Sequence, residues 1–168
     1  MEKFLLIASD VHADSEVFEK LAVLAQNPDC LAFLFCGDLG ADDYFISDIL
    51  QRRNFVFLSV LGNCDSATDY IAAGLPSVPL FRTCEFCNKR IFMTHGHYFT
   101  QPADAGLVNE DFDFVFTGHT HINGIIKTEK TVYLNPGSAS RPRGGQKASY
   151  AVVIFKKDGS TEEEIRFI

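Results

Sequence analysis

Short apolar segments, polar loops and amphipathic stretches alternate through the first 65 residues of the chain. The apolar segments have the length of buried strands and lie at residues 4–8, 31–36 and 55–61. Between them, apolar residues recur at helical spacing from Asp14, a capping residue, to about residue 26, and from Asp43 to about residue 52. This repeat of strand, loop and helix predicts βαβ units that form a parallel sheet.

The second half of the chain has a different rhythm, in which apolar segments are joined by short turns. The pattern predicts a helix at about 102–109 and strands at 78–86, 89–93, 112–116, 122–127, 131–135, 148–156 and 162–168. Six of these strands pair as hairpins, one of them through the turn Cys87-Asn88. We therefore expect mixed or antiparallel sheet joined to the parallel half. No linker interrupts the chain, which predicts a single domain over residues 1–168.

Composition excludes several classes of protein. Of the 168 residues, 46% are hydrophobic and 12% aromatic, which suits one domain with a sizeable core. A net charge of −7 disfavours binding to long nucleic acid, and no apolar run approaches the roughly 18 residues of a membrane span. Five cysteines without a signal-like segment predict reduced thiols and a cytoplasmic protein. The sequence leaves both a monomer and a homo-oligomer open.

Potential metal ligands follow five of the apolar segments. The clusters are Asp10-Val11-His12, Gly37-Asp38, Gly62-Asn63-Cys64-Asp65, His95-Gly96-His97 and Gly118-His119-Thr120-His121. Ligands of open α/β sheets bind beyond the carboxyl ends of the strands, so the five clusters are expected to converge. Alternate residues of extended backbone point the same way, which lets each Asp-x-His or His-x-His pair aim at one centre.

Each cluster also has an ordinary structural interpretation. An aspartate at a strand end, such as Asp38, is usually a helix cap or a turn residue. Asn63 after a glycine suits a left-handed turn, and a lone histidine in a glycine-rich turn is usually a surface residue. These interpretations hold for one cluster at a time. Five such clusters at five strand ends favour a shared site.

The donor set exceeds what one zinc ion needs. Two carboxylates, one amide oxygen and four imidazoles suit two divalent ions held close together. Mixed oxygen and nitrogen ligation without thiolate favours transition metals over Ca²⁺. We expect Mn²⁺ first, with Zn²⁺, Ni²⁺, Fe and Co²⁺ as alternatives. Asp38 stands alone in its cluster and is the candidate for a bridging ligand.

The ordered set DxH, GD, GNCD, HGH and GHTH resembles the calcineurin-like metallophosphoesterases, over residues 10 to about 145. GNCD, THGH and the later NPGS at 135–138 are similar to the small YfcE-like phosphodiesterase subfamily. The resemblance implies an α/β fold, a four-layer αββα sandwich with two mixed β-sheets. It also implies one metal held by Asp10, His12 and His121, a second held by Asn63, His95 and His119, and Asp38 as the bridge.

The resemblance implies hydrolysis of a small phosphodiester by in-line attack of a hydroxide that the two metals share. Many family members place a histidine after the metal-binding asparagine, where it is taken to help protonate the leaving group. Cys64 stands there in this chain, and a neutral thiol is a weaker donor than imidazolium. His97 and metal-bound water are therefore the candidates for the proton donor, and Cys64 is kept as a catalytic candidate because of its position. Asp65 is expected to orient a neighbour, with a plain turn residue as the alternative.

Two other functions stay open on the same sequence. One is a phosphomonoesterase or nucleotidase that uses the same metal centre on a small phosphoester. The other is a non-catalytic interaction scaffold, like the small subunit of the retromer coat, although a scaffold need not keep all seven donors. Arg141 and Arg143 follow the NPGS segment, and arginine suits phosphate recognition. An exposed structural loop is the other interpretation of that pair and the expected one.

Overall fold

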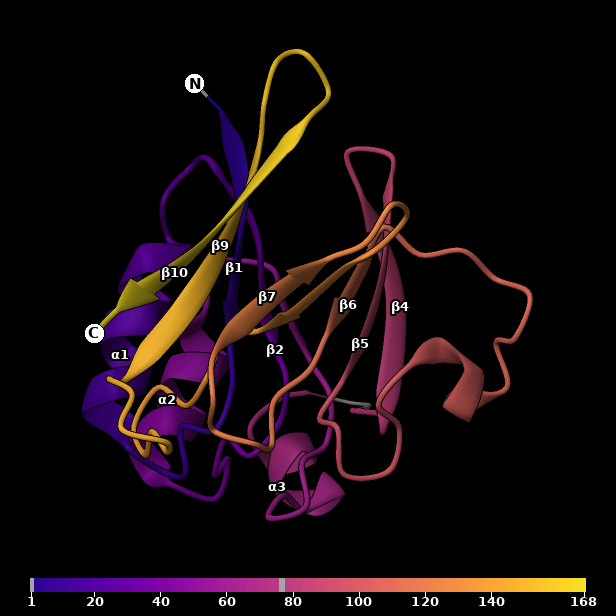
Figure 1. The fold of residues 1–168 in the computed structure, drawn as a ribbon. Helices are drawn as coiled ribbons and strands as arrows, with labels where there is room; N and C mark the ends of the chain where they lie inside the picture. Colours follow the sequence, from indigo (N-terminus) through magenta and orange to yellow (C-terminus); the bar gives the residue numbers. More distant parts are fainter. Residues whose placement is uncertain (1, 76–77) are drawn as a thin grey trace.

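Two five-stranded sheets pack face to face in the structure, a computed structural model that describes residues 2–75 and 78–168 (Figure 1). The first sheet has the order β10-β9-β1-β2-β3 and the second the order β4-β5-β6-β8-β7. The first comprises β1 (Lys3–Ala8), β2 (Cys30–Phe35), β3 (Phe57–Ser59), β9 (Ser149–Phe155) and β10 (Thr161–Phe167). The second comprises β4 (Phe81–Phe86), β5 (Lys89–Thr94), β6 (Phe114–Phe116), β7 (Gly124–Lys127) and β8 (Val132–Asn135). Both sheets are mixed, because parallel neighbours such as β1 and β2 or β5 and β6 are flanked by antiparallel ones.

Successive side chains of a strand point to opposite faces of the first sheet, so each face has its own hydrophobic core. In β1, Leu5 and Ile7 face the second sheet, whereas Leu6 and Ala8 face the helices. From the other side, Ile91 and other alternate residues of the second sheet fill the space between the two sheets. This alternation follows from the two-residue period of a strand. The apolar segments of the sequence are continuous because both faces of these strands are buried.

Two helices, α1 (Ser15–Ala25) and α2 (Tyr44–Arg52), cover the outer face of the first sheet (Figure 1). Both begin where the sequence predicts. The Asp14 carboxylate accepts a hydrogen bond from the Val17 N–H, and the Asp43 carboxylate caps α2 in the same way. The ring of Phe18 in α1 packs against the aromatic rings of β2, including Phe33 at 6.0 Å between ring centroids.

The outer face of the second sheet carries a smaller apolar cluster, in which Phe92, Phe112 and Val115 are buried. A 3-10 helix, η1 (Pro102–Ala105), lies over this face with the loops around it. The predicted helix at 102–109 is wrong beyond Ala105, because Gly106 takes a left-handed conformation and ends the turn. The α/β class and the two mixed sheets are confirmed.

Three other features differ from the sequence prediction. The strand predicted at 55–61 is only the three residues of β3. A short helix, α3 (Ala67–Ala72), was not predicted, since Tyr70 is its one buried residue and no amphipathic period develops. The final hairpin, β9 and β10, joins the first sheet instead of the other strands of the second half. Within the described residues, no helix has the length and apolarity needed to cross a membrane.

Candidate metal centre

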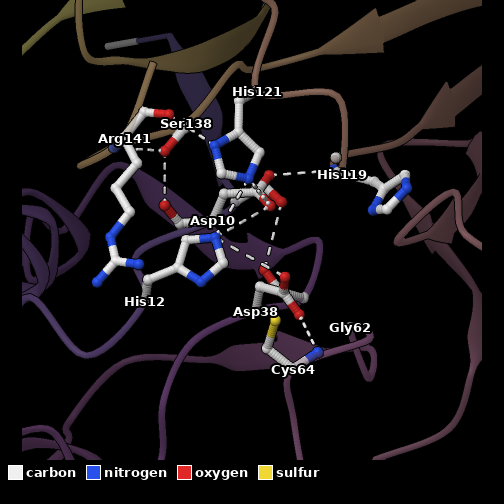
Figure 2. Close-up of polar contacts among 12 residues, drawn as sticks. Asp10, His12, Asp38, Gly62, Cys64, His119, His121, Ser138 and Arg141 are labelled. Atoms are coloured by element: carbon white, nitrogen blue, oxygen red, sulfur yellow. Dashed lines mark hydrogen bonds and ion pairs between the residues drawn. The ribbon is translucent and has the colours of Figure 1, made fainter. Parts of the chain in front are cut away.

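The first donor group consists of Asp10, His12 and His121, which the loops after β1 and β6 bring together (Figure 2). The His121 Nε2 atom lies 3.2 Å from Asp10 Oδ1 and 3.2 Å from His12 Nε2. The distance from His12 Nε2 to Asp10 Oδ1 is 3.8 Å. Atoms that share one ion at about 2.0–2.2 Å lie about 3–3.5 Å apart, so this spacing suits a common cation.

The chemistry of the first group also fits a cation. Asp10 Oδ2 accepts a hydrogen bond from the His119 N–H, whereas the buried Oδ1 has no hydrogen-bond partner among the described residues. Burial raises the pKa of Asp10, because a charged carboxylate is costly away from water. The His121 Nδ1 atom lies 2.6 Å from the carbonyl oxygen of Arg141 and therefore carries the proton. The lone pair of His121 Nε2 is consequently available to a metal.

The second donor group consists of Asn63, His95 and His119. The Asn63 Oδ1 atom lies 3.1 Å from His95 Nε2 and 2.9 Å from His119 Nδ1. The other ring nitrogen of His95, Nδ1, lies 2.7 Å from the carbonyl oxygen of Cys36. A carbonyl only accepts, so Nδ1 carries the proton and Nε2 is free to bind a metal.

Asp38 lies between the two groups. Its Oδ2 atom is 3.8 Å from His12 Nε2 in the first group and 3.5 Å from His95 Nε2 in the second. Its Oδ1 atom accepts a 2.8 Å hydrogen bond from the Cys64 N–H. Burial acts to raise the pKa of Asp38, but the hydrogen bonds from His95 and Cys64 outweigh burial and lower it. This placement is the one expected of a bridging carboxylate.

The backbone at the proposed ligands is strained. A positive φ is uncommon for residues other than glycine and costs about 1–2 kcal/mol each. Five of the seven proposed ligands have one: Asp10 (56°), His12 (49°), Asp38 (58°), His119 (66°) and His121 (61°). Such strain persists where the surrounding contacts fix the chain, and it gathers at functional sites.

Two glycines let the loops approach each other closely. A Cβ atom on Gly62 would lie 2.0 Å from Asp38 Oδ1 and 2.4 Å from the Asp38 main-chain nitrogen. A Cβ atom on Gly118 would lie 2.0 Å from Ser9 Oγ and 3.0 Å from Asp10 Oδ2. No side chain fits at either position, which confirms that glycine here serves close approach of the loops.

Asp65 supports the loop that carries Asp38. Its carboxylate accepts hydrogen bonds from the main-chain N–H groups of Asp38, Leu39 and Gly62 at 2.7, 3.0 and 2.8 Å. The Tyr70 hydroxyl of α3 donates a further bond at 3.1 Å. Asp65 thus orients main-chain groups and not a histidine. Tyr70 is not predicted from the sequence, because the hydrophobic pattern does not place α3 beside this loop.

Two serines, also missed from the sequence, hold the main chain of the first group. The Ser138 hydroxyl donates to the carbonyl oxygen of Asp10 at 2.7 Å, and the Ser140 hydroxyl donates to that of Val11 at 2.7 Å. Ser138 is the last residue of the NPGS segment, and Gly137 beside it has a φ of 77°. The Pro-Gly of this segment indicates a turn, but nothing in the sequence marks the main-chain groups that the two hydroxyls contact.

Cys64 lies at the exposed edge of the site. Its Sγ atom and ligand atoms of His12 and Asp38 all lie within 4.8 Å of one another, so the thiol faces the donors. Partial burial and the negative charges of Asp38 and Asp65 raise the pKa of the Cys64 thiol. The thiol therefore keeps its proton at neutral pH.

His97 lies behind the second group. Its ring centroid is 5.2 Å from that of His95 and 6.2 Å from that of His119. Burial lowers the pKa of His97, and the charges of those two histidines lower it further. A histidine that is neutral at pH 7 is a poorer proton donor than an ordinary one.

Comparisons with known proteins show the family to which the chain is similar. The model of the calcineurin-like phosphoesterase superfamily domain matches residues 4–158. The phosphodiesterase YfcE of Escherichia coli strain K12 is 29% identical over 160 residues, which cover 89% of this chain and 86% of the relative. The solved structure of that phosphoesterase has a TM-score of 0.71 and 25% identity, covering 96% of this chain and 98% of the other.

A second type of neighbour has the same fold. The structure of Vps29 from Entamoeba histolytica, solved in complex with Zn²⁺, has a TM-score of 0.63 and 20% identity. It covers 97% of this chain and 98% of the other. At this level of identity the likeness concerns the fold alone.

Proposed function

The chain belongs to the calcineurin-like phosphoesterase superfamily, a family of phosphoric ester hydrolases, and we propose that it hydrolyses a small phosphodiester at a centre of two divalent metal ions. The carboxylate of Asp38, within 4 Å of a histidine nitrogen in each of two separate donor groups, is the observation that carries this proposal. The relative named a phosphodiesterase supports the choice of a diester.

In this proposal Asp38 would contribute to holding both ions. One ion would be held by Asp10, His12 and His121, and the other by Asn63, His95 and His119. When bound, the ions would activate water and offset the negative charge that develops on the phosphoryl oxygens. Mn²⁺ is the first choice, and Zn²⁺, Ni²⁺, Fe and Co²⁺ suit the same oxygen and nitrogen donors.

The residues of the chain fix the donors but offer only weak proton donors to the leaving group. The carbonyl oxygens of Cys36 and Arg141 hold the rings of His95 and His121, so that each Nε2 atom keeps its place in the site. Cys64 retains its proton but is a weak acid, and His97 is neutral at pH 7. We therefore propose a preference for esters with good leaving groups, such as aryl phosphodiesters.

The same site leaves two competing functions to be tested. A phosphomonoesterase or nucleotidase would use the same donors, because the metals supply similar chemistry to both substrate classes. A non-catalytic scaffold is supported only by the likeness of this fold to that of Vps29. The presence of six donor side chains in two groups, with Asp38 between them, argues against a scaffold, which has no need of them.

The decisive experiment is an assay of metal-stripped protein reconstituted with Mn²⁺, Zn²⁺, Ni²⁺ or Mg²⁺. An aryl phosphodiester and an aryl phosphomonoester are compared at equal concentration, and circular dichroism confirms that each sample is folded. We expect faster turnover of the diester with at least one transition metal. Faster turnover of the monoester would replace the proposal with its phosphomonoesterase alternative. Absence of turnover with every metal would favour the scaffold.

We also propose a cytoplasmic setting and a small substrate. All five cysteines are free thiols in the structure, which suits a reducing compartment. The net charge of −7 disfavours long nucleic acid as a substrate. Size-exclusion chromatography with light scattering would decide between a monomer and a homo-oligomer.

A further inference from the structure

Main-chain hydrogen bonds hold the loop after β8 against the first donor group. The Arg141 N–H donates to Ser138 Oγ at 2.7 Å, and Ser138 in turn donates to the carbonyl oxygen of Asp10. The carbonyl oxygen of Arg141 accepts the 2.6 Å bond from His121, and the Arg143 N–H donates to the carbonyl oxygen of His121 at 3.1 Å. The backbone of Arg141 is therefore fixed relative to two proposed metal ligands, whatever its side chain does.

The side chain of Arg141 is not held by hydrogen bonds or ion pairs to other described residues. It extends from this fixed backbone toward His12, and its guanidinium lies beside the His12 ring in Figure 2. Within residues 2–75 and 78–168, the guanidinium forms no ion pair and no hydrogen bond, although Arg141 is next to an acidic site. Its charge reaches His12: burial lowers the pKa of His12, the carboxylates of Asp38 and Asp10 oppose that effect, and the charge of Arg141 adds a smaller lowering.

We propose that the Arg141 guanidinium binds a non-bridging phosphoryl oxygen of the substrate on the His12 side of the site. This inference rests on the proposed function, and it names the residue that recognises the phosphoryl group. Guanidinium presents a planar fork of donors that matches phosphate oxygens, and such charge-assisted hydrogen bonds are strong. A cation that the fold leaves without a partner is available for an anion brought by the substrate.

Arg143 is the contrasting residue of the same loop. It is exposed like Arg141 and lies two residues further along the chain. Its main chain contacts His121, but its charge is not among the larger influences on the pKa of His12, as that of Arg141 is. Substitution of Arg143 therefore removes the same charge from the loop without removing the group that faces His12.

The test compares Arg141→Gln and Arg141→Lys with Arg143→Gln as the matched control. Binding of inorganic phosphate to the Mn²⁺-loaded protein is measured by isothermal titration calorimetry, and KM and kcat are measured with an aryl phosphodiester. One charge-assisted hydrogen bond corresponds to about tenfold to a hundredfold in affinity. We expect Arg141→Gln to raise the phosphate Kd and the KM by that factor, with kcat within about threefold of wild type. Arg141→Lys should be intermediate and Arg143→Gln within about twofold of wild type.

Two results would overturn the inference. One is a phosphate Kd for Arg141→Gln equal to that of wild type. The other is an equal loss in Arg141→Gln and Arg143→Gln, which would indicate the net charge of the loop and not a positioned guanidinium. Metal content is measured for each variant, and Arg141→Lys replaces Arg141→Gln if the latter loads incompletely. Phosphate binding needs no turnover, so a wild-type protein without activity would refute the proposed function and leave this titration valid.

Discussion

The carboxylate of Asp65 accepts a 2.7 Å hydrogen bond from the main-chain N–H of Asp38, 27 residues earlier in the chain. The same carboxylate accepts bonds from the N–H groups of Leu39 and Gly62. Asp38 has a φ of 58°, so its loop needs external support to stay in place. The proposed bridging ligand thus depends on a carboxylate that is not itself a ligand.

Asp65→Asn should loosen this loop. An amide nitrogen cannot accept a hydrogen bond, so several N–H groups would share one oxygen that carries no charge. We expect the free energy of unfolding to fall by about 1–3 kcal/mol and metal affinity to fall about tenfold to a hundredfold. Urea unfolding and metal titration would measure both. Asp42→Asn, at an exposed position in the same region, is the control, and equal behaviour of the two variants would contradict the supporting role.

Removal of the Asp38 side chain should affect metal binding more than any other single change. Asp38→Ala deletes a carboxylate that lies within 4 Å of both donor groups, at His12 and at His95. We expect metal binding and activity to be lost together, as measured by elemental analysis of the dialysed protein and by the diester assay. Asp42→Ala should retain the metal content of wild type. Two ions per chain in Asp38→Ala would refute the bridging role.

Gly62→Ala should destabilise the protein through steric conflict alone. The new Cβ would lie 2.4 Å from the Asp38 main-chain nitrogen, and backbone cannot move aside as a side-chain end can. We expect a loss of about 1–3 kcal/mol or more in the free energy of unfolding, with weaker metal binding. At Gly124, no heavy atom lies within 4 Å of an added Cβ and φ is not positive. Gly124→Ala should therefore stay within about 0.5 kcal/mol of wild type, and similar losses in both variants would contradict this account.

Local patterns predicted the elements of the first half because each signal acts over a few residues. Asp14 and Asp43 cap their helices through N–H groups two or three residues away. The convergence of the first three donor clusters was also predictable, since β1, β2 and β3 are parallel and end at one edge of the first sheet. The clusters after β5 and β6 belong to the second sheet, so their approach depends on how the two sheets pack. The pairing of β9 with β1 was not, because it joins residues about 150 positions apart and leaves no local trace.

The supporting contacts of the site could not be predicted for a related reason. Asp65 and Ser138 bind main-chain groups, which every residue carries, so the sequence does not mark their partners. The sequence marks Arg141 and Arg143 alike for phosphate recognition, and only the position of the Arg141 guanidinium beside His12 distinguishes them. A sequence names side chains with distinctive chemistry, whereas the contacts that orient them depend on tertiary structure.

The metal-free protein should show a pH-dependent contribution from His95. Burial lowers the pKa of His95, but the hydrogen bond to Asp38 and the charge of Asp10 outweigh it, so the pKa lies above the usual value. A raised folded-state pKa contributes stability that is fully present below about pH 6.5 and is lost as pH rises through the folded-state pKa. We expect the difference in Tm between wild type and His95→Gln, measured with chelator, to shrink as pH rises from 5.5 to about 8.5. The His12 shift has the opposite sign and is common to both proteins, whereas His97 loses the part of its shift that comes from the charge of His95.

With metal bound, the difference in Tm between wild type and His95→Gln should change with pH in the opposite direction. A metal needs the unprotonated Nε2 of His95, so protons compete with it at low pH. Wild type loaded with Mn²⁺ should therefore gain stability over His95→Gln as pH rises. A difference that is independent of pH with and without metal would contradict the coupling between His95 and Asp38.

Cys64→His should change which leaving groups the enzyme accepts. The Cys64 side chain lies close to His12 and Asp38, and its raised pKa leaves only a weak acid at neutral pH. An imidazole at this position, beside the negative charge of Asp38, would be protonated more readily and would donate to an alkoxide. We compare two alkyl aryl diesters, one whose aryl oxide is a poor leaving group and one whose aryl oxide is a good leaving group. We expect kcat for the first to rise at least about tenfold relative to kcat for the second. Cys64→Ser has no imidazole and should not alter that ratio, and metal content is measured because histidine is also a ligand. An equal change for both leaving groups would show that position 64 does not act on the departing oxygen.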